Sequence, residues 1–225
     1  MSKVMIVTDR RPRVSDVDSR THDPEGVRRD IIVIATEEFA SKGLSGARVD
    51  EIAARTRTSK RMIYSYFGDK EGLFVAVLEA AYARIRTIEA TLDLAGLPPA
   101  LAMRKLAEFT FTYQNENPDF VRLVMVENIH NGAHLAQSSS IHAVNASVLQ
   151  VLRDIYDRGV AQGVFRPGLD VVDIHMTMSA LSFFNVSNRA TFSLIFKRNM
   201  ASRAALLRRR DVVADTIMSF VRKSG

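Results

Sequence analysis

The sequence predicts an all-α protein, and three observations support that expectation. Apolar residues recur at helical spacing along most of the 225-residue chain, strand-like alternation is nearly absent, and glycine or proline closes several of the apolar-periodic segments. With 47% apolar residues, the chain has ample material for a packed core. We therefore expect a group of short helices near the N-terminus, followed by a larger helical domain.

The first helix is expected over about residues 24–42. Ile31, Ala35 and Phe39 fall at i, i+4 and i+8 on one face, and Gly43 stands where helices commonly end.

A long helix should follow from Lys70 to the Gly-Leu-Pro-Pro break at residues 96–99. Asn117 and Pro118 then form a favourable helix start, a capping residue followed by proline at the first helical position. Further helices are expected at about residues 100–115, 118–131, 141–159, 171–187 and 201–223, with residues 163–168 as a connection.

Residues 49–74 contain two short helical segments around a tight turn. Val49 and Ile52 lie on one side of the first segment, which ends before Arg57 in the turn. Ser59 is a natural N-cap for the second segment, because its hydroxyl can accept from a free backbone N–H.

The second short segment has an apolar and a polar face. Ile63 and Phe67, four residues apart, would dock on neighbouring helices. Tyr64 then lies on the same face as Lys60 and Arg61. An exposed tyrosine beside two cations is more typical of a nucleic-acid-binding surface than of an ordinary solvent-exposed face. Arg61 can form a bidentate contact with a guanine edge, and Lys60 near the helix start can reach bases or phosphate.

Other positions near this segment can contact phosphates. Tyr64 and Tyr66 carry hydroxyls, and Lys70 brings an ammonium to a helix N-terminus. A solvated basic face is the alternative for the charge run alone. Together with the turn and the cap, the pattern favours a helix-turn-helix whose second helix enters the DNA major groove. The predicted DNA contacts are Arg48, Arg57, Ser59, Lys60, Arg61, Met62, Tyr64, Ser65, Tyr66 and Lys70.

Composition excludes several classes of protein. The net charge of +6 suits a polyanionic partner, and no stretch approaches 18 uninterrupted apolar residues, so no membrane span is expected. The absence of cysteine fits a cytoplasmic protein. Glycine-rich phosphate loops, the nucleophile elbow and the His-Glu-x-x-His motif are missing, so we expect no enzyme and no cofactor. Residues 1–22 are expected to form a mobile tail or a basic arm that follows the minor groove.

Residues 28–75 resemble, almost position for position, the DNA-reading segment of TetR-type transcriptional regulators. The resemblance implies a helix-turn-helix DNA-binding domain over residues 23–70 and a helical ligand-binding and dimerisation domain over residues 71–225. It further implies a homodimer joined through its last two long helices, a near-palindromic double-stranded DNA operator, and a small-molecule effector. Ligand binding would then shift the linking helix and lower the affinity for DNA.

Two positions depart from the family pattern. Arg57 stands in the turn where family members usually have glycine, and a left-handed backbone there would cost an arginine about 1 kcal/mol. Arg48 stands where the family tends to cap its second helix with threonine. Both changes add positive charge near the DNA.

Residues 117–130 and 183–189 also resemble the branch that contains repressors of pyrimidine and nicotinate catabolism. That likeness implies a small, polar effector, a planar heterocycle or an organic acid. The candidate ligand contacts are Phe109, Tyr113, Arg122, Glu127, His130, His175, Met178, Phe184, Asn185 and Asn188.

Each candidate ligand contact has a plainer alternative. Glu127, His130 and His134 share a helical face and can form polar interhelical bonds, contact a ligand, or hold a metal ion, which we do not expect because a fourth ligand is missing. Asn185 must be bonded across a dimer seam or to a ligand. Arg122 can pair with Glu127 or with a ligand carboxylate.

The aromatic pair Phe109 and Tyr113 suits a core as well as a stacking wall. The basic run at residues 208–210 is expected to be a solvated helix face. An architectural or protein-partnered DNA-binding protein without an effector is the alternative function, and it predicts weak sequence preference with steep salt dependence.

Overall fold

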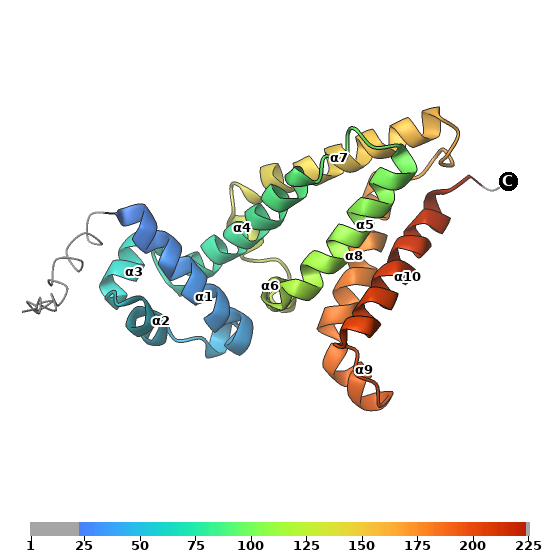
Figure 1. The fold of residues 1–225 in the computed structure, drawn as a ribbon. Coiled ribbons are helices and arrows are strands. Elements are labelled where there is room, and N and C mark those ends of the chain that lie inside the picture. The colour runs from blue at the N-terminus through green and yellow to red at the C-terminus, as the bar shows by residue number, and fades with distance from the viewer. Residues whose placement is uncertain (1–22, 224–225) are drawn as a thin grey trace, which may run out of the picture.

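The computed structural model describes residues 23–223, where regular structure is helical apart from one isolated antiparallel bridge between Phe165 and Arg222 (Figure 1). The α-helices are α1 (Pro24–Gly46), α2 (Val49–Thr56), α3 (Lys60–Phe67), α4 (Lys70–Glu89), α5 (Pro99–Glu116), α6 (Pro118–Ile129), α7 (Ile141–Ala161), α8 (Val171–Ser187), α9 (Arg189–Ile195) and α10 (Arg203–Val221). Two 3-10 turns, η2 (Ala90–Leu92) and η3 (Leu135–Gln137), complete this part of the chain. The all-α prediction is confirmed, whereas the tail or arm predicted for residues 1–22 lies outside the described residues.

Most helix positions agree with the pattern, and three details differ. The long helix α4 ends at Glu89 rather than near residue 95, and α9 was not predicted. Asn117 and Pro118 do occupy the N-cap position and the first turn of α6, but the Asn117 side chain makes no capping bond there. The Asn117 side chain instead donates to the Tyr113 carbonyl at 2.8 Å, so it closes α5 behind it.

The N-terminal helices enclose their own apolar core. Ile31 and Phe39 of α1, Ile63 of α3 and Phe74 of α4 are fully buried, and the Phe39 and Phe74 rings meet edge to face at 5.1 Å. Leu123 of α6 is part of the same cluster. α4 supplies side chains to this core over its first half and leaves it over its second half. The domain division predicted at residues 70 and 71 stays a prediction.

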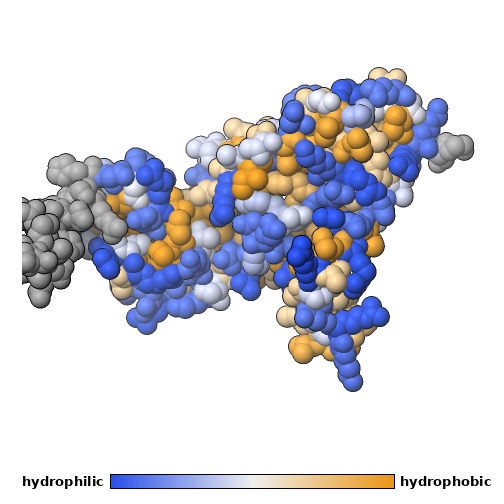
Figure 2. Space-filling view, viewed as in Figure 1, coloured by the Kyte–Doolittle hydropathy of each residue, from blue (hydrophilic) through white to orange (hydrophobic). Residues whose placement is uncertain are grey.

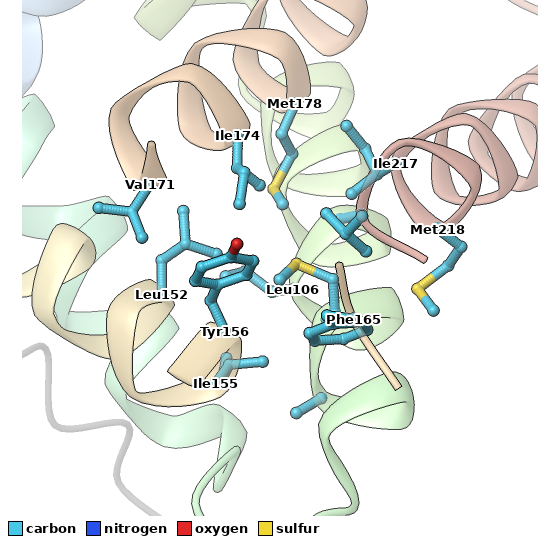
Figure 3. Close-up of a cluster of buried hydrophobic side chains, with 14 of the residues drawn as sticks. Leu106, Leu152, Ile155, Tyr156, Phe165, Val171, Ile174, Met178, Ile217 and Met218 are labelled. Carbon is cyan, nitrogen blue, oxygen red and sulfur yellow. The ribbon is translucent and has the colours of Figure 1, made fainter. Parts of the chain in front are cut away.

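A second, larger core lies among α5, α7, α8 and α10 (Figure 3). Tyr156 accepts from the Leu169 backbone N–H and donates to the Arg166 carbonyl, so it anchors the connection between α7 and α8. The Phe165 ring lies against Gly159, where a Cβ atom would be 2.0 Å from the ring. A glycine is therefore required at this point of α7.

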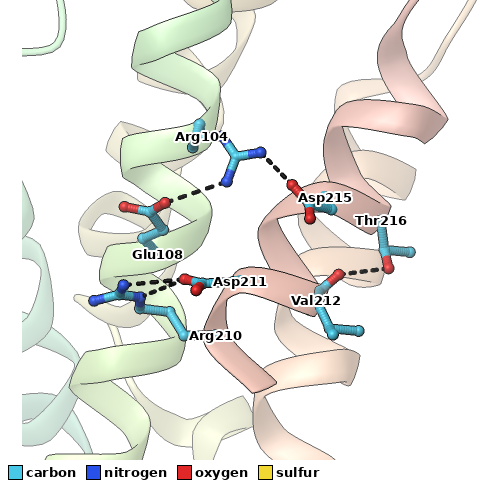
Figure 4. Close-up of polar contacts among 7 residues, drawn as sticks. All are labelled: Arg104, Glu108, Arg210, Asp211, Val212, Asp215 and Thr216. Carbon is cyan, nitrogen blue, oxygen red and sulfur yellow. Dashed lines mark hydrogen bonds and ion pairs between the residues drawn. The ribbon is translucent and has the colours of Figure 1, made fainter. Parts of the chain in front are cut away.

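Outside this core, α5 and α10 are joined by charged side chains. Arg104 pairs with Glu108 on its own helix and with Asp215 of α10, while Arg210 pairs with its neighbour Asp211 (Figure 4). These pairs are partly exposed, so each contributes little to stability. The arginine run at residues 208–210 is in part a solvated face as predicted, although Arg209 also lines a surface hollow.

The end of α9 carries apolar side chains into solvent. Leu194, Ile195 and Phe196 are each more than half exposed, and Figure 2 shows apolar surface near the end of this projection, beside hydrophilic side chains. In the part of the chain that the structure describes, no helix joins the length and the apolar character that crossing a bilayer requires.

Candidate nucleic-acid interface

The turn between α2 and α3 has the geometry of a tight helix-turn-helix. Arg57 ends α2 in the left-handed conformation, with φ 54° and ψ 34°. Its backbone N–H points back at the carbonyls of Ala53 and Ala54, and the Thr58 N–H donates to Ala53 at 3.0 Å. These bonds satisfy the last carbonyls of α2 and redirect the chain into α3. Of the alternatives left open for this turn, Arg57 thus has the left-handed backbone that family members meet with glycine.

Ser59 starts α3 as predicted. Its hydroxyl accepts from the Met62 backbone N–H at 3.1 Å, which satisfies one of the free donors at the helix start. Ile63 is the fully buried residue of α3. Arg61, Met62 and Ser65 are exposed on the other side of the helix. The polar face expected for a recognition helix is therefore open to a partner.

Lys60 and the two tyrosines are held at the edge of this face. The Lys60 Nζ atom lies 3.3 Å from Asp50 of α2 and 5.9 Å from the centre of the Tyr64 ring. Tyr64 and Tyr66 are half-buried, and their rings pack against the N-terminal core. Packing of the rings leaves the two hydroxyls as the polar ends through which phosphate contact is expected.

The start of α4 is less open to phosphate than the sequence suggested. Asp69, which the sequence reading missed, caps α4 by accepting from the Gly72 N–H at 2.7 Å. The Lys70 ammonium donates to the Ser45 carbonyl at 3.2 Å and so joins α4 to the end of α1. A phosphate at this position would have to share Lys70 with Ser45, and the Asp69 carboxylate would oppose it.

Arg48 occupies the N-cap position of α2 without a side-chain capping bond. Its backbone N–H donates to the buried Glu38 carboxylate at 3.0 Å, and Lys42 pairs with the same carboxylate at 2.9 Å. The start of α2 is thus held from α1, and the exposed Arg48 side chain lies 3.8 Å from the Glu51 carboxylate in the first turn of α2.

In the larger domain, Glu127 and His134 are both buried and bonded to each other. The Glu127 carboxylate contacts the His134 ring at 2.8 Å and accepts from the backbone N–H groups of His134 and Leu135. The His130 ring packs edge to face on His134 at 5.1 Å. These contacts agree with the reading as polar bonds between segments. Within residues 23–223, no three His, Asp or Glu side chains are grouped to hold a metal ion.

The asparagines of α8 lie beside a shallow surface hollow. The Asn185 side chain donates to the side-chain oxygen Oδ1 of Asn115 at 2.7 Å, and the Arg189 guanidinium donates to the same oxygen at 2.5 Å. Asn185 is therefore bonded to α5 within one chain, so the expectation that it bonds only across a dimer seam or to a ligand is wrong. The hollow is lined by Phe184, Asn185, Asn188, Arg189, Phe192, Met200 and Arg209.

Arg122 pairs with Asp119 at 3.1 Å, and the alternative pairing with Glu127 is wrong because His134 occupies that carboxylate. Met178 is buried in the large core, where its sulfur accepts from the Thr110 hydroxyl at 3.4 Å. A ligand contact by Met178 would therefore require that core to open.

Phe109 and Tyr113 form a tilted ring pair with centres 5.8 Å apart. Tyr113 also meets Phe120, which in turn meets Tyr82 of α4 at 5.3 Å. His175 of α8 is largely buried. Burial lowers its pKa to about 4, and the positive charge of Arg86 contributes to the same shift.

Three polar residues of this region were missed by sequence reasoning: Tyr82 and Arg86 of α4, and Gln114 of α5. For two of them the available signal was four-residue spacing after a buried residue. Tyr82 follows Leu78, and Gln114 follows Thr110 on the face of α5 that meets α8.

Comparison with known proteins identifies the fold and the family. Residues 31–77 match the family model "Bacterial regulatory proteins, tetR family", and residues 99–217 match "Tetracyclin repressor-like, C-terminal domain". The chain is 34% identical over 186 residues to the HTH-type transcriptional repressor NicS of Pseudomonas putida, covering 83% of this chain and 88% of that protein.

Two further likenesses extend over much of the chain. It is 33% identical over 141 residues to the HTH-type transcriptional repressor SCO4008 of Streptomyces coelicolor, covering 61% of this chain and 69% of the other. The crystal structure of the transcriptional regulator SCO4942 of Streptomyces coelicolor superposes with a TM-score of 0.65 at 24% identity, over 87% of this chain and 98% of that one. The TetR-type helix-turn-helix predicted from residues 28–75 is confirmed, and the chain belongs to the TetR family of DNA-binding transcriptional regulators.

Proposed function

We propose that this regulator is a repressor that binds a near-palindromic operator as a homodimer and is released by a small molecule. The observation that carries the DNA-binding part is the exposed face of α3, where Arg61 and Ser65 follow a capped turn. A guanidinium on such a face can read a guanine edge, while neighbouring groups contact phosphate. Both curated relatives described above are named repressors, which supports that direction of control.

The apolar surface of α8 and α10 supports a homodimer. These helices pack against each other and expose five large apolar side chains: Val172, Met176, Phe184, Leu207 and Val212. Exposed apolar area on paired helices is typical of a protein–protein interface. A two-fold dimer would place two α3 helices about one DNA turn apart.

α4 offers a route from effector to operator. Its first half packs in the N-terminal core, and its second half carries Ile85 and Arg86 into the larger domain. A ligand that favours one position of α4 would change the spacing of the recognition helices and thereby the affinity for DNA. The effector that we propose is the one implied by the resemblance of residues 117–130 and 183–189, a small polar heterocycle or acid. Contact with genomic DNA implies a cytoplasmic location, and no catalytic role is proposed.

Selection of genomic fragments by the purified protein, followed by sequencing, tests this function. A sharp near-palindromic site is expected, and a reporter gene behind that site should be silenced by the protein. Diffuse enrichment with steep salt dependence would instead favour the architectural alternative. A sharp site that no small molecule releases would favour a regulator that answers to a protein partner.

A further inference from the structure

The short helix α9 forms a projection with large apolar side chains exposed at its end. Leu194, Ile195 and Phe196, which we call the apolar tip, are 79%, 68% and 57% exposed. Figure 1 shows α9 beyond the lower end of α8 and α10, and away from α2 and α3. The apolar tip is therefore separate from the DNA-reading face. None of its three residues belongs to the set that we assign to the homodimer contact.

The projection is held to α8 by a row of aromatic rings. The Phe192 ring of α9 meets the Phe184 ring of α8 edge to face at 5.0 Å, and the Phe196 ring at 5.1 Å. Such contacts fix the direction in which a helix leaves its neighbour. The apolar tip is thus a built, convex feature of the surface.

The turn that ends α9 brings two cations directly behind the apolar tip. Lys197 has a left-handed backbone with φ 49°. Its N–H donates to the Leu194 carbonyl at 3.4 Å, and the Arg198 N–H donates to the Ser193 carbonyl at 3.1 Å. This pair of bonds is a Schellman motif, which closes the helix and reverses the chain. The side chains of Lys197 and Arg198 are both exposed.

The stretch of chain around the apolar tip is strongly positive. Residues 174–210 contain no aspartate or glutamate, and they carry seven lysines and arginines. These are Arg189, Lys197, Arg198, Arg203, Arg208, Arg209 and Arg210. A second copy of the chain would bring the same charges toward those of the first, and repulsion would oppose that contact. An anionic partner would gain from every cation that it meets.

The order of the apolar residues favours a fluid partner. Leu194, Ile195 and Phe196 are consecutive, and consecutive side chains of a helix point about 100° apart. A groove on a protein covers one stripe of a helix, at i, i+3 and i+4. The DNA backbone offers phosphates but no apolar surface for three such side chains. The acyl chains of a bilayer can surround the apolar tip on several sides, while anionic headgroups pair with the cations behind it.

We infer that the end of α9 binds the surface of an anionic lipid bilayer. Leu194, Ile195 and Phe196 enter the boundary between headgroups and acyl chains, and Lys197 and Arg198 pair with headgroup phosphates. The contact is peripheral and reversible, because only a few side chains enter the bilayer. It does not rest on the proposed operator or effector.

The chain contains no tryptophan, so one introduced tryptophan reports on one place. Phe196→Trp places the reporter at the apolar tip, and Leu101→Trp places it at an exposed position of α5 as the control. The probes are vesicles of phosphatidylcholine with or without an equal share of phosphatidylglycerol. With the anionic vesicles, the emission of Phe196→Trp should shift to shorter wavelength and be quenched by brominated acyl chains. Neutral vesicles should bind at least about tenfold more weakly, and the emission of Leu101→Trp should not change.

The contribution of charge is tested in the Phe196→Trp background. Lys197→Gln/Arg198→Gln should lower the affinity for anionic vesicles by at least about tenfold, since each cation near a bilayer contributes about fivefold. Lys60→Gln/Arg61→Gln removes the same charge from the exposed face of α3 and should leave the vesicle affinity nearly unchanged.

The contribution of the apolar side chains is tested by Leu194→Ser/Ile195→Ser in the same background. This variant should lower the vesicle affinity by at least about tenfold, because it withdraws several apolar carbons from the bilayer. Leu101→Ser removes an exposed leucine elsewhere and should bind like the parent. Both changes are at exposed positions, so thermal unfolding should show folded proteins.

Four outcomes would overturn the inference. An unchanged emission of Phe196→Trp with anionic vesicles would leave a protein partner as the occupant of the apolar tip. Equal affinity for neutral vesicles would exclude the role of charge. Equal losses from the α3 and α9 charge variants would show binding by overall charge alone. A blue shift that grows with protein concentration in the absence of lipid would show that a second copy covers the tip.

Discussion

Replacing Arg57 by glycine should stabilise the folded protein and lower its affinity for DNA. The left-handed backbone at Arg57 costs a residue with a Cβ atom about 1–2 kcal/mol. Glycine removes this cost, but it also makes the unfolded chain more flexible, which lowers the free energy of unfolding by about 0.5–1 kcal/mol. The backbone bonds to Ala53 and Ala54 remain in the variant. The net gain in the free energy of unfolding is therefore about 0.5–1 kcal/mol.

The gain is measured by thermal and denaturant unfolding. For a chain of this size, about 1 kcal/mol raises the melting temperature by about 2–4 °C. The DNA effect is measured as operator affinity against salt concentration. If Arg57 contacts a phosphate, Arg57→Gly should weaken binding to all sequences alike and make the salt dependence less steep by about 0.9 in the logarithmic slope.

Arg57→Ala separates the two effects. It removes the same charge but keeps the Cβ atom, so it should lose DNA affinity like the glycine variant and gain no stability. If Arg57→Ala is stabilised as much as Arg57→Gly, relief of repulsion among the basic residues of the turn explains the gain. The backbone strain would then be refuted as the cause.

Three further predictions concern the recognition helix, the start of α4 and the core. Arg61→Ala should cost about 1–3 kcal/mol of operator binding and relax specificity at one base pair; equal losses on operator and random DNA would refute base reading. Lys70→Ala should flatten the salt slope by about one unit, and an unchanged slope would leave Lys70 only its bond to Ser45. Because the unfolded chain protonates His175 near pH 6.5 and the folded protein only near pH 4, lowering the pH across that interval should reduce the free energy of unfolding by up to about 3 kcal/mol. The fall should largely disappear in His175→Phe, as measured by urea unfolding at several pH values.

The helix-turn-helix was readable from the sequence because its determinants are local. A capping hydroxyl, an i, i+4 apolar pair and a turn residue lie within a few positions of each other, and each acts on its own stretch of backbone. Ser59 and Arg57 accordingly have the conformations that their neighbours imply. The all-α class follows from the same short-range periodicity.

The bonding partners of the larger domain were not readable, because they depend on which helices meet. Asn185 bonds to Asn115, 70 positions away, rather than across a seam. Arg122 pairs with Asp119 on its own helix, because the Glu127 carboxylate is already bonded to His134. Such choices are made among side chains distant in sequence, where burial and competition for one carboxylate decide the outcome.

The sequence by itself determined the all-α class, most of the helices and the DNA-reading turn, because local spacing and capping specify them, and its resemblance pointed to the family. Only the tertiary structure decided that Arg86 of α4 and Gln114 of α5 would each be buried with one polar atom that has no partner among the described residues. In the unfolded chain, water can hydrogen-bond to every polar side chain. Packing of the helices excludes that water, so the partners of a buried polar atom depend on which helices meet around it.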